Sequence, residues 1–143
     1  MNFLTLLLAG FLTFATQGWQ NNLEKAKTEA QAAHKQILLN FSGSDWCGPC
    51  IKLTREVFES ESFKNYANQN LVLLNADFPR QKKNQLSKEQ TALNEALADQ
   101  YNKAGTFPLT LLLDENGKVL KKWEGNPGLK PEQFVAALQA AKK

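Results

Sequence analysis

The stretch ILLNFSGSDWCGPC, residues 37–50, joins a short apolar run to the only two cysteines of the chain. ILLNF (37–41) combines branched and aromatic side chains and is predicted to form a buried strand. SGSDW interrupts this run, and apolar side chains then recur at helical spacing from Cys47 to Phe58. The cysteine pair is therefore expected where a buried strand passes into a helix.

Four further helices are predicted from amphipathic spacing and from capping residues. Ser60 and Ser87 precede two of them as N-caps, and Gln90 stands three residues after Ser87, as in a capping box. Pro131 suits the first position of the last helix, because proline needs no backbone N–H there. The side chains expected to face inward are Leu23, Ala26, Ala30 and Ala33 in 22–35, Phe63 and Tyr66 in 61–69, Leu93, Leu97 and Tyr101 in 88–102, and Phe134, Val135 and Leu138 in the last helix.

Three further strands are predicted, at 71–77, 109–113 and 118–123. The last two are joined by the tight turn DENG and are expected to form a hairpin. Buried strands joined through helices indicate the α/β class, with helices on both faces of one sheet in a three-layer sandwich. We expect a mixed sheet that is mostly parallel, with an antiparallel C-terminal hairpin.

Length and composition fit one domain with a core of its own. The chain has 143 residues, of which 43% are hydrophobic and 22% charged, and its formal net charge is +3. The nearest approach to a basic patch is Arg80, Lys82 and Lys83, without interleaved aromatic residues. We therefore expect a solvated loop there and no nucleic-acid partner.

The N-terminal segment has the pattern of a secretory signal. The first eighteen residues carry no charged side chain, and the thirteen residues Phe3–Ala15 are largely apolar. This length is short for a membrane span and typical of the apolar part of a signal peptide. We predict a signal peptide at 1–18, cleaved between residues 15 and 20, and a periplasmic or secreted domain at 19–143. The usual positive flank is missing, so an uncleaved N-terminal membrane anchor is the alternative.

Roles other than redox chemistry explain the cysteine pair less well. A zinc site needs about four ligands, whereas the pair supplies two and His34, the only histidine, lies on the first predicted helix. A haem attachment would need histidine directly after Cys50, where Ile51 stands. A structural disulfide is possible in an oxidising compartment, but closing so small a loop removes little unfolded-state entropy.

A redox pair explains these residues better. Cys47 falls at the predicted helix start, where unpaired N–H groups and the helix dipole favour a thiolate. Cys50 follows three residues later, where it can reach the sulfur of Cys47. It is expected to be less exposed than Cys47. Gly48 permits close backbone approach, and Pro49 needs no N–H bond in a first turn. We expect Cys47 to attack a partner disulfide and Cys50 to resolve the mixed disulfide.

WCGPC (46–50) after a buried strand, with Thr106-Phe107-Pro108 opening a later strand, resembles the thioredoxin superfamily over about 22–143. FSGSDWC and REVFES are more similar to extracytoplasmic thioredoxin-like proteins of bacteria than to cytoplasmic thioredoxin. These proteins include the C-terminal domain of the thiol:disulfide interchange reductase DsbD. The resemblance implies a thioredoxin-like fold and a thiol–disulfide oxidoreductase. It implies no metal and no cofactor beyond the redox-active Cys47–Cys50 disulfide.

The resemblance also implies which residues bind a substrate. Pro108 is expected to be cis and to pack across from the cysteines, and the backbone just before it to pair with the substrate. An alternative interpretation of Phe107 is that it is simply a core residue and does not contact the substrate. The implied substrate-binding residues are Trp46, Gly48, Pro49, Thr106, Phe107 and Pro108.

One departure from that family concerns proton transfer. The family's buried aspartate, which assists the resolving cysteine, corresponds to Asn40 here, and its usual lysine partner falls near Leu73. Asparagine cannot act as a base, so resolution is expected to rely on water or on a nearby carboxylate such as Asp45 or Glu56.

Two further departures concern the chain around the site. The stretch from Asp77 to Pro108 is about twice as long as in a minimal thioredoxin. PRQKKNQLSK (79–88) within it is expected to be an exposed loop beside the active face, either selecting partners or inert. The family's first strand is expected to be absent or reduced to a few residues near Trp19.

The Gly-Pro dipeptide between the cysteines resembles that of reducing thioredoxins. We expect a potential on the order of −200 to −280 mV. The expected partners are disulfide-containing proteins and a membrane or thioredoxin-type electron donor, and the chain is expected to be monomeric. A disulfide isomerase or oxidant is the alternative enzyme, and a non-catalytic binding module is the alternative from another class.

Overall fold

The computed structural model describes residues 18–142. The predicted signal peptide and its cleavage lie almost wholly outside the described residues. In chain order the elements are α1 (Leu23–Ala33), β1 (Gln36–Ser42), α2 (Gly48–Leu53), the π-helical turn η1 (Thr54–Phe58), α3 (Glu61–Asn70), β2 (Leu71–Asp77), the short turn η2 (Lys82–Asn84), α4 (Lys88–Tyr101), β3 (Leu109–Leu113), β4 (Val119–Glu124) and α5 (Pro131–Ala140).

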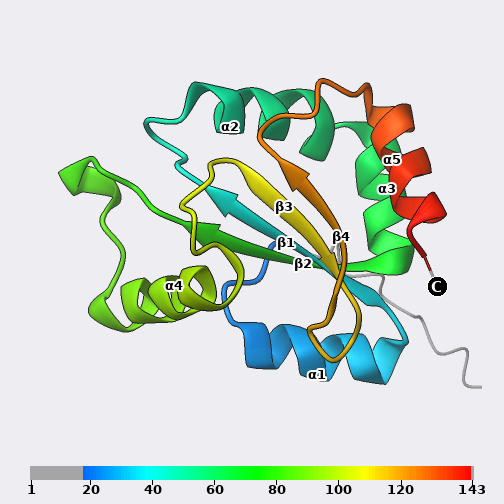
Figure 1. Cartoon of the computed structure of the whole chain (residues 1–143), viewed down its shortest axis with the longest axis horizontal. Coiled ribbons are helices and arrows are strands. Elements are labelled where there is room, and N and C mark those ends of the chain that lie inside the picture. The colour runs from blue at the N-terminus through cyan, green and yellow to red at the C-terminus, as the bar shows by residue number, and fades with distance from the viewer. Residues whose placement is uncertain (1–17, 143) are drawn as a thin grey trace, which may run out of the picture.

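Helices cover both faces of a four-stranded sheet (Figure 1). α1 and α4 pack on one face, and α2, η1, α3 and α5 pack on the other. Each face has its own apolar cluster, and alternate residues of β1 supply both: Leu39 and Phe41 belong to the first cluster and Leu38 to the second. The predicted three-layer α/β sandwich is confirmed. By the same alternation, Asn40 lies on the face that carries α2.

The strands are ordered β2-β1-β3-β4, and the sheet is mixed as predicted. β1 runs parallel to β2 but antiparallel to β3, and β3 pairs antiparallel with β4 in the predicted hairpin. The expectation of a mostly parallel sheet is therefore wrong. Continuous apolar runs such as those of β1 and β3 indicate burial on both faces, but they do not indicate the direction in which a strand runs.

The expected first strand is reduced to one residue. Gln20 forms an isolated parallel bridge with Leu74 at the outer side of β2. Its backbone N–H donates to the carbonyl of Leu73 at 2.7 Å, and its carbonyl accepts from the N–H of Asn75 at 2.9 Å. The segment near Trp19 thus extends the sheet by a single bridge.

The predicted N-caps are confirmed, but one capping box is only half formed. Ser60 and Ser87 accept hydrogen bonds from the N–H groups of Phe63 and Gln90, at 3.2 and 3.1 Å. The Gln90 side chain does not return to Ser87. It donates instead to the carbonyl of Asn21.

Two inward-facing predictions, Leu93 and Ala33, are wrong, and a third, Val135, holds only in part. Leu93 is 41% exposed, and the neighbouring Asn94 is buried in its place. Asn94 donates to the carbonyl of Asp77 at 2.9 Å, so a polar contact with the end of β2 sets the rotation of α4. Ala33 is exposed in the last turn of α1, and Val135 is only half-buried on α5. Spacing alone identifies an apolar face to within one residue.

Candidate active site

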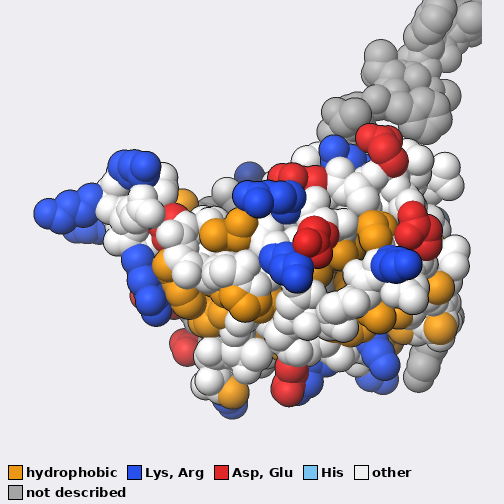
Figure 2. Space-filling view, turned by 90° about the horizontal axis from the view of Figure 1, so that it is seen from above, with side chains coloured by type: hydrophobic (Ala, Val, Ile, Leu, Met, Phe, Trp, Pro, Cys, Tyr) orange, Lys and Arg blue, Asp and Glu red, His pale blue; other side chains and the backbone are white. Residues whose placement is uncertain are grey.

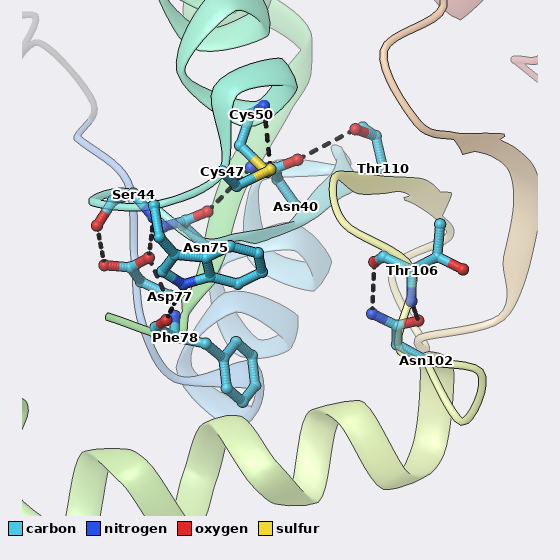
Figure 3. The surroundings of a disulfide bond; sticks show 11 residues. Asn40, Ser44, Cys47, Cys50, Asn75, Asp77, Phe78, Asn102, Thr106 and Thr110 are labelled. Carbon is cyan, nitrogen blue, oxygen red and sulfur yellow. Dashed lines mark hydrogen bonds between the residues drawn. A yellow bond between two sulfur atoms is a disulfide. The ribbon is translucent and has the colours of Figure 1, made fainter. Parts of the chain in front are cut away.

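Cys47 and Cys50 form a disulfide at the start of α2 (Figure 3). Cys47 is the N-cap of the helix, and its Sγ accepts from the backbone N–H of Cys50 at 3.3 Å. Pro49 stands in the first turn, next to the exposed Gly48. Cys47 and Cys50 are 5% and 2% exposed. The predicted position at a helix start is confirmed, and Cys50 is the less exposed of the two.

A tight turn leads from β1 into this helix. The carbonyl of Gly43 accepts from the N–H groups of Trp46 and Cys47, at 3.2 and 2.8 Å. A Cβ atom at residue 43 would overlap the indole ring of Trp46, so the turn requires glycine. Ser44 is tied to Asp77 at the end of β2, through its N–H at 2.9 Å and its hydroxyl at 2.6 Å.

Three aromatic side chains from separate segments meet at Trp46, the residue before Cys47. The Trp46 indole N–H donates to the carbonyl of Phe78 at 2.7 Å. The ring of Phe107 lies 5.5 Å from that of Trp46 and 5.5 Å from that of Phe78, with edge-to-face geometry in both pairs. Phe107 therefore packs against the core, and its ring also contacts Trp46, the residue before Cys47. Its role in binding a substrate stays a prediction.

The peptide bond between Phe107 and Pro108 is cis, as the resemblance implies. Asn102, which is buried, holds the residue before this pair. Its Nδ2 donates to the carbonyl of Thr106 and its Oδ1 accepts from the N–H of Thr106, both at 2.9 Å (Figure 3). Within residues 18–142, the backbone N–H and carbonyl of Phe107 make no hydrogen bond. The free backbone groups at this place are therefore those of Phe107, whereas those of Thr106 are occupied.

A neutral polar triad occupies the sheet on the side of α2 (Figure 3). Asn40, 3% exposed, donates through Nδ2 to Oδ1 of Asn75 at 3.1 Å, and its Oδ1 accepts from the Thr110 hydroxyl at 3.1 Å. Leu73 lies opposite Leu38, two residues from the pair of Asn40 and Asn75. The expected partner position near Leu73 is thus corrected to Asn75. The buried amide is satisfied without any charge.

Neither of the carboxylates expected to replace the buried acid is bonded to a cysteine. Asp45 accepts from the N–H groups of Arg80 and Gln81 at 3.0 and 2.9 Å, and from the Asn84 side chain at 3.1 Å. These donors, the Arg80 N–H first, lower the pKa of Asp45 below its ordinary value of 3.8. Glu56 is exposed and lines a groove of about 550 Å³ that also touches Gly48 and Pro49.

Among residues 18–142, no group of three or more His, Cys, Asp and Glu side chains is placed to hold a metal ion. His34 ends α1, where it adopts a left-handed backbone conformation. In the same described part of the chain, no helix is long and apolar enough to cross a membrane.

Three side chains that shape the site were not predicted from the sequence. Asn75 and Thr110 flank Asn40 from the two neighbouring strands, and Asn102 holds Thr106. A polar residue inside an apolar strand was the available signal for the first two. Asn102 follows the last turn of α4 and carries no such signal.

The thioredoxin-like domain family matches residues 23–142, so the chain belongs to this family. It is 37% identical over 110 residues to the disulfide bond reductase DsbH of Chlamydia pneumoniae, in an alignment that covers 77% of this chain. The same alignment covers 64% of DsbH, so the chain spans less than two thirds of that relative.

Solved structures agree with this family. A DsbH oxidoreductase structure superimposes with a TM-score of 0.78 at 33% identity, covering 89% of this chain and 85% of that one. The C-terminal domain of DsbD from Neisseria meningitidis, in its oxidised form, gives a TM-score of 0.57 at 15% identity, covering 83% and 91%. The second likeness shows the fold alone. The predicted thioredoxin-like fold is confirmed.

Replacing Asn40 by aspartate is expected to restore a buried acid. Burial raises the pKa of a carboxyl group above about 3.9, so Asn40→Asp should add an ionisation to the pH profile of disulfide reduction by the reduced protein. Because the pKa is higher in the folded than in the unfolded state, stability should fall as pH rises from about 4. Each unit by which the folded-state pKa exceeds the unfolded-state pKa lowers the stability at neutral pH by about 1.4 kcal/mol.

Stopped-flow reduction of a small disulfide and urea unfolding, both across pH, measure the two effects. Asn68→Asp adds the same charge at an exposed position of α3 and should leave both profiles unchanged. If the pH profile of disulfide reduction already contains this ionisation in the wild type and is unaltered in Asn40→Asp, the interpretation that residue 40 lacks a buried acid is contradicted.

Removing the Asp45 carboxylate is expected to release residues 79–86, which we call the arm. Because the amide donors lower the pKa of Asp45, their attachment is fully present above pH 3.8 and lost as pH falls through the lowered value. Asp45→Ala should therefore speed tryptic cleavage after Arg80, Lys82 or Lys83 by about tenfold at neutral pH, because local opening governs cleavage. Mass spectrometry identifies the cut, and Asp99→Ala on the exposed side of α4 is the control. Equal cleavage of the two variants would show that Asp45 does not hold the arm.

Proposed function

We propose that the protein is a thiol–disulfide oxidoreductase that reduces disulfides of extracytoplasmic proteins at Cys47 and Cys50. The observations that carry this proposal are the disulfide at the start of α2 and the cis peptide of Pro108, which follows Phe107. Phe107 has free backbone groups, and its ring contacts Trp46, the residue before Cys47. Membership of the thioredoxin-like family and 37% identity to a disulfide bond reductase support it.

The reaction begins with the reduced pair. The Cys47 thiolate, favoured by the helix start and by the N–H of Cys50, attacks one sulfur of a partner disulfide. A mixed disulfide forms, and the other partner sulfur leaves as a thiolate that takes up a proton. Cys50 then loses its proton and attacks Sγ of Cys47, which releases the second partner sulfur. The partner gains two electrons and two protons, and the Cys47–Cys50 disulfide is regenerated.

The substrate chain is proposed to lie along the segment that ends in Pro108. The unpaired N–H and carbonyl of Phe107 offer two hydrogen bonds to an extended backbone. Asn102 acts as a positioning residue, because it fixes the backbone of Thr106 on both sides. Trp46 supplies an apolar wall beside the sulfurs, and Gly48 and Pro49 leave the approach from the groove open.

The Cys50 proton must leave without a buried carboxyl group. Asn40, Asn75 and Thr110 are neutral, and Asp45 is engaged with the arm. We assign water as the acceptor during resolution. The pH dependence of the reaction should then follow the cysteines themselves.

The direction of electron flow and the compartment are further parts of the proposal. The apolar N-terminal pattern supports export. Outside the cytoplasm a reducing pair must be recharged, so we propose a membrane or thioredoxin-type electron donor. The Gly-Pro dipeptide supports a reductase over an isomerase or oxidant.

Equilibration with glutathione tests the direction. We expect a reduction potential between about −200 and −280 mV, because the dipeptide tunes the stability of the Cys47 thiolate. Quantifying the dithiol and disulfide forms by alkylation and mass spectrometry gives the value. Cys50→Ser, which cannot close the internal disulfide, corrects for glutathione adducts on Cys47. A potential above about −150 mV would assign the protein to the oxidants.

A trapping experiment tests the substrates. In Cys50→Ser the mixed disulfide cannot be resolved, so cells expressing the full chain should accumulate partners bonded to Cys47. Non-reducing separation and mass spectrometry should identify exported proteins among them. The double variant Cys47→Ser/Cys50→Ser is the matched control. Partners retained by that control without any mixed disulfide would instead identify a binding module.

A further inference from the structure

The arm, residues 79–86, projects from the domain between β2 and α4 (the green segment at the left of Figure 1). Its base is nevertheless fixed to the active site. The Asp45 carboxylate, two residues before Cys47, holds the backbone of Arg80 and Gln81 and the side chain of Asn84. The Gln81 side chain donates to the carbonyl of Asp45 at 3.3 Å. The position of the arm is therefore set by the loop that carries the nucleophile.

Arg80 brings the arm into contact with Trp46, the residue before Cys47. Its guanidinium carbon lies 3.7 Å from the centre of the Trp46 ring, a cation–π contact. The Trp46 ring is itself fixed by the carbonyl of Phe78 and by the ring of Phe107. A chain that lies along Phe107 toward Cys47 thus passes next to Arg80.

The cations of the arm lack acidic partners. Arg80, Lys82 and Lys83 are exposed, and none of them forms an ion pair with a carboxylate among residues 18–142. In the described part of the chain, the one carboxylate bound to the arm is that of Asp45, which receives N–H groups and not these cationic side chains. Three positive charges beside one negative charge leave the arm with an excess of positive charge.

On the face seen in Figure 2, this excess of positive charge lies at the arm. Lysine or arginine side chains mark the projecting tip at the left, whereas basic and acidic side chains alternate over the body. Lys52 and Arg55 on α2 and η1, for example, are accompanied by Glu56 on η1 and by Glu59 directly after it. Where opposite charges lie close together, their effects on an approaching ligand cancel. The like charges of the arm instead add to one another within a Debye length of about 10 Å at 0.1 M salt.

We propose that the arm is a docking surface for acidic segments that flank the target disulfide in the substrates of this protein. This inference rests on the exchange activity proposed above but not on its direction. Glutamate and aspartate carboxylates match Lys82 and Lys83, and the Asp45 anchor keeps these cations beside the path to Cys47. Such charge complementarity acts mainly on the rate of encounter.

Other anionic partners fit the arm less well. Recognition of an anionic membrane by basic residues typically uses clusters of about four to eight lysines and arginines, and the arm has three cations. Nucleic-acid surfaces interleave aromatic residues among the basic ones, and no aromatic residue lies within 79–86.

Two disulfide peptides of equal length, one flanked by glutamates and one by lysines, test the proposal. Stopped-flow reduction by the reduced wild-type protein at about 20 mM salt should show a kcat/KM ratio of about tenfold in favour of the acidic peptide. In Lys82→Glu/Lys83→Glu the ratio should fall to about one or below. At about 0.5 M salt, screening should remove most of the wild-type preference.

Lys118→Glu/Lys121→Glu is the matched control, because it reverses two exposed lysines at the opposite end of the sheet. It should keep the wild-type ratio within about twofold. Equal rates for both peptides in the wild type would overturn the docking surface. It would also be overturned if the kcat/KM ratio fell equally in the two double variants. Failure to reduce either peptide would instead contradict the exchange activity. Binding of anionic phosphatidylserine vesicles through Lys82 and Lys83, without any peptide preference, would make the arm a membrane contact.

Discussion

The turn between β1 and α2 is the constraint on which the site depends. Two N–H groups converge on the carbonyl of Gly43, and only a residue without a Cβ atom leaves room for the Trp46 ring above it. Asp77 fixes the same turn from the neighbouring strand through two hydrogen bonds to Ser44. Because the turn is held from both sides, Cys47 lies at the N-cap of α2, where the helix N-terminus stabilises negative charge on sulfur.

The charged side chains near this turn lie at its rim, and the interior position beside it is neutral. The interior position of Asn40 is neutral and fully hydrogen-bonded, which avoids the cost of burying an unpaired charge. The carboxylates lie at the rim instead, where Asp77 holds the turn and Asp45 holds the arm. The acidic residues thus position segments, which agrees with the proposal that the thiol chemistry uses the cysteines and water.

Local patterns predicted the elements of this fold, while their relations across the sheet required the structure. Alternation and caps identified the strands and the helix starts, because both depend on neighbouring residues in sequence. The antiparallel course of β3 and the pairing of Asn40 with Asn75 depend on tertiary contacts. The same limit explains Asn94, whose side chain binds the distant carbonyl of Asp77. Asn102 binds Thr106, which is only four residues away, but in an irregular segment that no spacing rule describes.

The two proposed contacts with a substrate would contribute differently to selection. Hydrogen bonds to the backbone of Phe107 use groups that every polypeptide possesses, so they orient a substrate without distinguishing one sequence from another. The exposed cations of the arm respond to side-chain charge, but they lie at the rim, where charge chiefly changes the rate of association. It follows that discrimination would occur at encounter, before the sulfurs meet. The exchange step itself would then be the same for every disulfide that reaches Cys47, which suits a reductase with many substrates of one charge class.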